Sequence, residues 1–316
     1  MPNSPADTRP APARPAESPV HVHVPQARAL ARLLPRLREL EGRTVVVKIG
    51  GHAMLRADLT RAFAEDVMLL RYAGLRPVVV HGGGPQISAH CERLGIEPAF
   101  RSGLRVTTAE TIDVVRMVLA GQVQRTLVGL LNEYAPVAVG MTGEDARTFT
   151  AVRRYAEAGG ERVDIGLVGD VAEVDPGVVA DHLAAGRIPV VSGPAPGTDG
   201  RVYNVNADTA AAALAAALGA DRLTVLTDVP GILRDWPEPG PVWDRLTVSQ
   251  ARGIQPGLSG GMLPKLEACL RAVTAGVAEA HILDGRDEHA LLLSYFADEP
   301  LGTLLVPDDD VSRRPA

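Results

Sequence analysis

The sequence predicts an α/β protein whose mainly parallel sheet is covered by helices on both faces. Short β-branched runs such as residues 44–47 and 77–81 alternate with longer stretches that space their apolar residues as a helix does. Runs that are apolar throughout are typical of strands buried on both faces, as in parallel sheets between helices. With 316 residues and 46% apolar content, the chain can build one large domain or two lobes.

The expected elements follow from where these runs begin and end. We expect strands at residues 44–47, 77–81, 136–139, 187–192, 223–226 and 281–283, and strands or a hairpin at 149–153 and 164–167. We expect helices at residues 26–40, 59–72, 85–93, 110–131, 178–185, 209–218 and 264–275. Gly74, Gly95 and Gly219 each follow a helix and stop it. Pro85 suits the first turn of a helix, whereas Pro35 should kink the first helix or restart it.

The composition argues against several classes of partner. A net charge of −6 without a basic run disfavours a nucleic-acid or membrane-surface partner. No run approaches the length of about 20 apolar residues that a transmembrane helix needs. Cys91 and Cys269 are expected to be buried thiols of a reducing compartment. Residues 1–25, rich in Pro and Ala and without a signal-peptide core, are expected to be a disordered tail of a cytoplasmic protein, and residues 309–316 a second tail.

The use of lysine is the most informative feature of the composition. Of 32 basic residues only Lys48 and Lys265 are lysines, so arginine occupies every other basic position. Both lysines adjoin glycine-rich turns: Gly50 and Gly51 follow Lys48, and residues 257–261 precede Lys265. An ammonium is a compact charge that fits against a phosphoryl oxygen in a tight backbone cradle. The two lysines are therefore predicted to bind a phosphoryl group.

Other turns carry similar signals. Three glycines at 82–84 directly follow the strand expected at residues 77–81. A strand, glycine turn and helix in this order direct backbone N–H groups and a helix N-terminus toward an anion. The turn that contains Thr227, Asp228 and Gly231 follows a strand and is of the kind that surrounds a nucleotide. Two residues have two interpretations. Arg105 is a surface charge or a carboxylate clamp, and Asp208 is the N-cap of the helix at 209–218 or a site residue.

Six motifs together resemble the acetylglutamate kinases of the amino acid kinase superfamily, and the resemblance runs from about residue 28 to residue 307. The motifs are Lys48-Ile-Gly-Gly51, His81-Gly-Gly-Gly84, Gly103-Leu-Arg-Val-Thr107, Asn204-Val-Asn-Ala-Asp208, Leu226-Thr-Asp-Val-Pro-Gly231 and Gly260-Gly-Met-Leu-Pro-Lys265. The resemblance implies a three-layer α/β/α sandwich in which residues 43–200 bind N-acetyl-L-glutamate and residues 201–308 bind ATP with Mg²⁺.

The resemblance also implies roles for single residues. Lys48 and Lys265 stabilise the transferring phosphoryl group, and Asp208 orients the two ammonium groups. The residues implied to hold the acceptor are Gly83, Gly84, Arg105 and Asn204. Those expected around the nucleotide are Gly50, Gly51, Thr227, Asp228, Gly231, Ser259, Gly260 and Gly261. No side chain is assigned to Mg²⁺, which is expected to arrive with the nucleotide. If the acceptor is a carboxylate, as the resemblance implies, it is already ionised at neutral pH and needs no general base.

Assembly and regulation are expected from the same resemblance. Residues 26–42 resemble the kinked N-terminal helix that ties dimers into a ring in family members inhibited by arginine. The chain is thus expected to form a homo-oligomer, a dimer or a hexameric ring. His281 matches a position of the arginine site, but Ser294 and Pro300 stand where the sensitive enzymes have Glu and Gly. We therefore expect weakened or absent inhibition by arginine.

Two alternative functions remain at the level of sequence. One is a kinase of the same fold that acts on another acylated acidic amino acid, such as N-acetyl-aminoadipate or carrier-linked glutamate. The other is an α/β-hydrolase, because residues 257–261 satisfy Gly-x-Ser-x-Gly around Ser259, and Asp284 and His289 follow in triad order. A nucleophile elbow requires an apolar strand directly before the serine, and residues 253–257 do not form one.

Overall fold

The computed structural model describes residues 27–101, 103–158, 161–297 and 299–309. The chain divides into two compact units, Met1–Glu39 and Leu40–Ala316. Residues 27–32 are helical, Leu33 is a turn, and α2 (Leu34–Leu40) then begins with Pro35 in its first turn. The expected restart of this helix is thus found, at a position where proline's missing N–H costs nothing. The expected tail at 1–25, and residues 310–316 of the other tail, lie outside the described residues.

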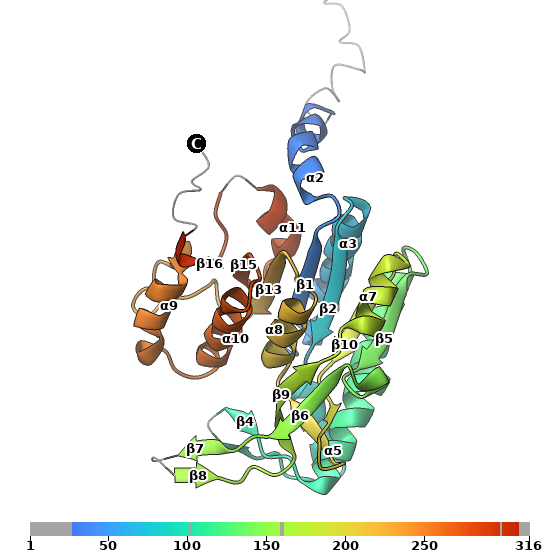
Figure 1. The fold of residues 1–316 in the computed structure, drawn as a ribbon, viewed down its shortest axis with the longest axis vertical. Helices are drawn as coiled ribbons and strands as arrows, with labels where there is room; N and C mark the ends of the chain where they lie inside the picture. The colour runs from blue at the N-terminus through green and yellow to red at the C-terminus, as the bar shows by residue number, and fades with distance from the viewer. Residues whose placement is uncertain (1–26, 102, 159–160, 298, 310–316) are drawn as a thin grey trace, which may run out of the picture. The chain divides into compact units, whose positions relative to one another are not determined.

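The second unit is built on one large sheet. Its strands are β1 (Thr44–Ile49), β2 (Arg76–His81), β5 (Ala138–Thr142), β10 (Ile188–Ser192), β13 (Arg222–Thr227), β14 (Arg245–Thr247), β15 (Glu279–Asp284) and β16 (Thr303–Val306). They are ordered β14-β16-β15-β13-β1-β2-β10-β5 (Figure 1). Neighbouring strands are parallel except for β15 and β16, which are antiparallel. The prediction of a mainly parallel sheet is confirmed.

Helices cover both faces of this sheet, so the unit has three layers. They are α3 (Ala57–Tyr72), α4 (Gly84–Arg93), α5 (Ala109–Arg116), α6 (Gln124–Asn132), α7 (Gly177–Ala184), α8 (Ala207–Ala217), α9 (Val248–Ile254), α10 (Met262–Thr274) and α11 (Ala290–Phe296). The short helical turns are Ala53–Leu55, Asp145–Arg147 and Gln255–Gly257, and a π-helical segment spans Met117–Val123.

Successive residues of the central strands pack in two different hydrophobic cores, one on each face of the sheet. Val46 of β1 packs in the core that α7, α8, α9 and α10 cover, whereas Val45 and Val47 pack in the core that α3 to α6 and α11 cover. All six residues of β1 are buried, which explains why Val45, Val46 and Val47 are apolar in succession rather than alternating with polar residues. β1 lies between β2 and β13, at the centre of the unit.

A smaller sheet adjoins the start of α8. Its strands are β6 (Phe149–Arg153), β9 (Val168–Val174), β11 (Ala195–Pro196) and β12 (Val202–Val205), in the order β11-β12-β9-β6. Two hairpins complete the fold: β3 (Phe100–Arg101) with β4 (Leu104–Arg105), and β7 (Ala156–Ala158) with β8 (Glu161–Val163). The strand expected at 164–167 is wrong, because the chain turns there and the strand begins at Val168.

One helix is long and apolar enough to cross a membrane by length and composition alone, although it contains no uninterrupted run of about 20 apolar residues. Residues Ala109–Asn132 form 24 continuous helical residues whose hydropathy passes the criterion for a span, although 44% of the window is buried inside the protein. Val114, Val118 and Leu127 on this helix are almost fully buried in the core between the sheet and α3. The helix is apolar because it packs inside the second unit.

Candidate active site

Lys48, Asp208 and Lys265 form one cluster. The Lys48 Nζ lies 2.7 Å from Asp208 Oδ1, and the Lys265 Nζ lies 3.1 Å from Asp208 Oδ2. The side chain of Lys48 is 7% exposed, that of Lys265 16% and that of Asp208 4%. Two ammonium groups that are 217 residues apart in the sequence thus converge on one carboxylate, as the sequence predicted.

The charges of the cluster stabilise one another. Burial alone would raise the pKa of Asp208, but the positive charges of Lys48 and Lys265 outweigh it and lower the pKa to about 2. Burial lowers the pKa of Lys48, and the Asp208 carboxylate opposes that shift. The carboxylate therefore keeps its charge at neutral pH and holds the two side-chain nitrogens in place.

Three elements bring these side chains together. Lys48 is the second-last residue of β1, in register with Val80 of β2 and Val225 of β13, so it lies at the carboxyl edge of the sheet. Asp208 lies in the first turn of α8 and Lys265 in the first turn of α10, and these two helices pack on each other. Ligands of open α/β sheets bind at this edge.

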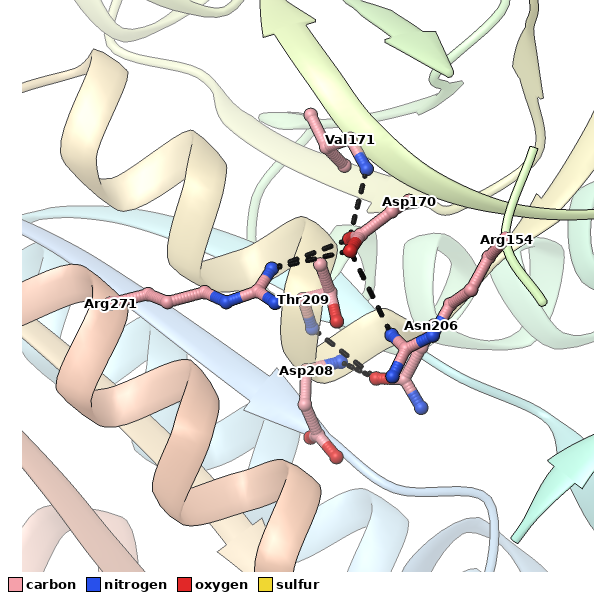
Figure 2. Close-up of polar contacts among 7 residues, drawn as sticks. All are labelled: Arg154, Asp170, Val171, Asn206, Asp208, Thr209 and Arg271. Carbon is pink, nitrogen blue, oxygen red and sulfur yellow. Dashed lines mark hydrogen bonds and ion pairs between the residues drawn. The ribbon is translucent and has the colours of Figure 1, made fainter. Parts of the chain in front are cut away.

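Asn206, not Asp208, is the N-cap of α8. Its Oδ1 accepts hydrogen bonds from the backbone N–H groups of Asp208 and Thr209, at 2.8 and 3.2 Å (Figure 2). The N-cap interpretation of Asp208 is therefore wrong, and its carboxylate is free to bind the lysines.

Two cavities meet at the lysines. The first has a volume of about 330 Å³ and is lined by the glycine turn at 82–84, by Arg105 and by Asn204. The second, of about 370 Å³, is lined by Leu226, Thr227 and Asp228, among others. The residues that line both are Lys48, Gly50, His52 and Lys265. The wall common to the two cavities thus carries both ammonium groups.

The expected acceptor residues all line the first cavity. Gly83, Gly84, Arg105 and Asn204 lie in its wall, and the Asn204 amide donates to Thr107 Oγ1 at 3.3 Å. Gly83 has no room for a side chain, because a Cβ atom there would lie 2.7 Å from Leu119 Cδ2. The missing side chain therefore lets this turn pack closely against Leu119.

Arg105 is buried and has no carboxylate partner among the described residues. Its Nη2 donates to the Gly84 carbonyl at 2.8 Å and to Ser88 Oγ at 2.7 Å, and its guanidinium lies over the Phe100 ring. The Nη1 is buried without a hydrogen-bond partner in the described structure. Burial lowers the pKa of this guanidinium, but an arginine side chain stays protonated in proteins. The surface-charge interpretation of Arg105 is wrong.

The expected nucleotide residues are only partly brought together. Gly50, Thr227 and Asp228 line the second cavity, while Gly51 lines the first. Four residues line neither of these two cavities: Gly231, Ser259, Gly260 and Gly261. Gly231 instead packs closely on Thr303, whose Oγ1 would lie 2.8 Å from a Cβ at that position.

The hydrolase triad is not assembled. Ser259 Oγ accepts a hydrogen bond from the Trp236 indole, at 3.3 Å, and Asp284 pairs with Arg286. The Nδ1 of His289 lies 2.6 Å from Asp66 Oδ1. Each member of the supposed triad has a different partner, and the helical turn Gln255–Gly257 takes the place of the strand that a nucleophile elbow needs.

Sequence reasoning missed several residues of the two cavities. His52 lines both, His81 and Arg154 line the first, and Arg286 lines the second. Burial lowers the pKa of His81 to about 4, so its imidazole is neutral at pH 7. His81 could have been recognised as a site residue, because it directly precedes three glycines. Nothing in the local sequence singles out Arg154 or Arg286.

Within the described ranges, no group of three or more His, Cys, Asp or Glu side chains is placed to hold a metal ion. The described carboxylate nearest the two lysines, Asp208, has both oxygens engaged by ammonium groups. These residues do not fit a magnesium site whose ligands are protein side chains.

Comparison with known proteins gives relatives over most of the chain. A profile of the amino acid kinase family matches residues 43–284. An acetylglutamate kinase of Acidothermus cellulolyticus is 61% identical over 286 residues, which are 89% of this chain and 97% of that protein. An acetylglutamate kinase of Streptomyces coelicolor is 58% identical over 92% of this chain and 95% of that protein.

Solved structures share the fold. An N-acetylglutamate synthase of Neisseria gonorrhoeae, complexed with coenzyme A and N-acetyl-glutamate, superposes with a TM-score of 0.78 at 24% identity. The match covers 89% of this chain and 63% of that one. A carbamate kinase of Giardia lamblia bound to AMP-PNP superposes with a TM-score of 0.62 at 18% identity, over 84% of this chain and 99% of that one. The three-layer sandwich expected from the motifs is thereby confirmed.

Proposed function

The chain belongs to the amino acid kinase family, and from that premise we propose that it transfers the γ-phosphoryl group of ATP to N-acetyl-L-glutamate. The acceptor atom is an oxygen of the side-chain carboxylate, and the products are N-acetyl-L-glutamyl 5-phosphate and ADP. Acetylglutamate kinases at 54–61% identity over most of the chain support this reaction, which belongs to arginine biosynthesis.

One observation carries the proposal. Two cavities of the size of small ligands share a wall, and that wall holds two buried ammonium groups fixed by one carboxylate. A group transferred from a donor in one cavity to an acceptor in the other must pass these ammonium groups. Phosphoryl transfer spreads negative charge over the equatorial oxygens of the transferred group, and preorganised cations stabilise that charge.

The site also fits an acceptor that is already ionised. A carboxylate with a reference pKa of about 4.3 needs no general base at neutral pH. His81 is in the wall of the first cavity, and its imidazole is neutral. Among the described residues, only its Nδ1 has a hydrogen-bond partner, the Gly82 carbonyl at 3.0 Å. Lys48 and Lys265 are positively charged partners of Asp208 and do not act as bases.

We assign the first cavity to the acceptor and the second to the nucleotide. The charged Arg105, with its unpartnered Nη1, supports binding of the α-carboxylate of the acceptor. Asn204 supports binding of the acylated amine, and Gly83 and Gly84 allow the acceptor to approach the backbone. Thr227 and Asp228 support binding of the nucleotide. Residues 43–200 and 201–308 are proposed to be the main sources of the acceptor and nucleotide sites, respectively.

Mg²⁺ is proposed to arrive bound to the phosphates of ATP. The described residues provide no carboxylate cluster for it, so the nucleotide itself would supply the ligands together with water. Its contribution when bound is to neutralise phosphate charge.

The decisive experiment traps the product. We expect ATP consumption with N-acetyl-L-glutamate, in the presence of hydroxylamine, to yield ADP and the hydroxamate that forms from an acyl phosphate. N-acetyl-aminoadipate and carrier-linked glutamate are tested in parallel. If either compound has a higher kcat/KM than N-acetylglutamate, the protein is a kinase for another acylated acid. Consumption of ATP without hydroxamate would reject the reaction.

Assembly, compartment and regulation complete the proposal. We propose a homo-oligomer, because Leu30 and Leu34 on the N-terminal helical residues are 67% and 64% exposed and offer an apolar face to a second copy. A cytoplasmic location is supported by the free buried thiols Cys91 and Cys269. Weak or absent inhibition by arginine is proposed from Ser294 and Pro300, and strong inhibition by millimolar arginine would contradict it.

A further inference from the structure

Arg154 is a cation of the acceptor cavity that none of the six motifs contains. It follows β6, its backbone N–H donates to the Val168 carbonyl at 2.8 Å, and its side chain is 28% exposed. In Figure 2 this side chain extends toward the start of α8, where Asn206 and Asp208 lie. Asn206 and Asp208 line the same cavity as Arg154. The guanidinium is therefore on the side of the cavity where the two lysines are, at its reacting end.

Asp170 connects Arg154 to the helix that carries Lys265. The Arg154 Nη1 lies 3.9 Å from Asp170 Oδ2, and Arg271 Nη1 lies 3.4 Å from Asp170 Oδ1 (Figure 2). Asp170 lies on β9, which packs against α8, and Arg271 lies on α10, six residues beyond Lys265. One carboxylate thus has contacts to a cavity-lining arginine and to the helix of a site lysine.

The charge of the cavity suggests what Arg154 binds. The charged side chains in its wall are four cations and one carboxylate: Lys48, Arg105, Arg154, Lys265 and Asp208. The proposed acceptor carries two carboxylates. Arg105, held by the Gly84 carbonyl and the Ser88 hydroxyl of α4, suits one of them. Because Arg154 extends toward the start of α8, it suits the carboxylate that receives the phosphoryl group.

We propose that Arg154 binds the side-chain carboxylate of the acceptor, and that Asp170 is the positioning residue that keeps its guanidinium at the start of α8. This inference rests on the proposed function, whose acceptor it describes further. A guanidinium binds a carboxylate with two parallel N–H donors, which fixes the orientation of the oxygen that attacks phosphorus. Asp170 contacts Arg154 at 3.9 Å and leaves most of its donors available for the acceptor.

The chain offers a matched control in the preceding residue. Arg153 pairs with Asp164, with Nη2 to carboxylate distances of 2.8 and 2.7 Å, and does not line the cavity. We expect Arg154→Gln to raise the KM for N-acetyl-L-glutamate about tenfold or more, as loss of a charge-assisted pair does, while the KM for ATP changes by less than about twofold. Arg153→Gln makes the same change of charge and should leave both values near those of the wild type.

Calorimetric binding without nucleotide tests the same contact independently of turnover. N-acetyl-L-glutamate should bind Arg154→Gln about tenfold more weakly than it binds the wild type. N-acetyl-L-glutamine, which lacks the side-chain charge, should bind the two proteins about equally. Arg154→Lys keeps the charge without the planar fork and should show an intermediate KM, which provides the test if Arg154→Gln does not fold.

Asp170 is tested through its dependence on Arg154. Asp170→Asn should raise the acceptor KM about threefold, should be rescued by Asp170→Glu, and should add nothing in an Arg154→Gln background. The unfolding midpoint should shift little, because partly exposed ion pairs contribute little to stability. Equal acceptor KM values for Arg154→Gln and Arg153→Gln, or full additivity of Asp170→Asn, would overturn this inference alone. A wild-type protein that forms no acyl phosphate would instead reject the proposed function.

Discussion

At the scale of single residues, the cluster requires compact cations. Lys48 Nζ lies 2.7 Å from Asp208 in a site where its side chain is 7% exposed. Arginine at position 48 or 265 keeps the charge but brings a bulky planar head that does not fit the same space. We expect Lys48→Arg and Lys265→Arg to lower kcat by about 10²-fold or more, in the range found when a group that stabilises transition-state charge is removed.

Hydroxamate formation measures this loss, and Arg271→Lys is the matched control. Arg271 lies on α10 like Lys265, but its side chain is 54% exposed. That reverse exchange should leave kcat within about twofold, because exposed ion pairs tolerate a change of cation. Near-normal rates for both lysine variants would show that charge alone, without compactness, is sufficient.

The pH dependence of the reaction should reflect Lys48. Burial lowers its pKa from the ordinary value of 10.5, so the ammonium loses its proton at a lower pH than an exposed lysine does. As pH rises through this lowered pKa, the positive charge is lost and kcat/KM falls. We expect the kcat/KM of the wild type to begin falling below pH 10.5. The residual activity of Lys48→Arg should show no such fall from position 48. A limb that begins only above pH 10.5 would contradict the assignment.

The sequence identified the two lysines, Asp208 and Arg105 because each lies in a motif of fixed spacing. It did not identify Arg154, because the approach of that residue to α8 depends on the pairing of β6 with β9 and of β9 with β12. It also placed Ser259 by motif alone, whereas the structure gives that hydroxyl an indole partner away from both cavities. Local patterns thus located the residues proposed to act on the ligand. They missed Arg154, whose position depends on the pairing of strands that are distant in the sequence.

At the scale of elements, an ion pair fastens α11 to α3. His289 precedes α11 and contacts Asp66 of α3 through Nδ1 at 2.6 Å, while the other Asp66 oxygen accepts the Leu292 N–H at 3.2 Å. The hydrogen bond to Asp66 raises the pKa of His289 above its ordinary value of 6.5. A raised pKa means that the pair stabilises the folded state fully below pH 6.5, and that this stabilisation is lost as pH rises through the raised value.

We therefore expect the free energy of unfolding of the wild type to fall between pH 6 and pH 8.5 by more than that of His289→Asn. Asparagine is chosen because position 289 has a φ of 60°, a left-handed conformation that asparagine tolerates. Urea unfolding at the two pH values measures the difference. Parallel pH dependence in the two proteins would show that the pair does not contribute.

The sequence predicted the central strands of the large sheet but not the strands at one edge of it. β1, β2, β10 and β13 are buried on both faces, and their apolar runs are legible in the sequence. β14 and β16 are only three and four residues long and lie at one edge of the sheet, where a short run gives no periodicity. The strand expected at 164–167 was displaced because its apolar residues, Ile165 and Leu167, pack around a turn.

At the scale of the whole molecule, the alternation of strands and helices was enough to predict the layered fold. Parallel strands need crossover connections, and helices placed on both faces bury the sheet completely. The position of the site follows from the same rule, because parallel strands deliver their carboxyl ends to one edge. What composition and alternation do not contain is how copies of the chain associate, which depends on surface side chains.

The last prediction concerns that association. The first unit, Met1–Glu39, exposes Leu30 and Leu34, whereas Leu40 at the start of the second unit is 3% exposed. Exchanging both exposed leucines for glutamate places charge on the apolar face proposed to meet a second copy, and should lower the mass measured by light scattering. We expect kcat to stay within about twofold, because no described residue of the first unit lines either cavity of the site.

Leu94→Glu is the control for that exchange, since Leu94 is 59% exposed at the end of α4, in the second unit. It introduces the same charge on the surface and should leave the mass unchanged. Deletion of residues 1–39 should give the same number of subunits as the double variant, because both remove the same contact. An unchanged number of subunits for the deletion would mean that the helix takes no part in assembly. A lowered mass accompanied by loss of kcat would mean instead that the site is complete only in the larger assembly.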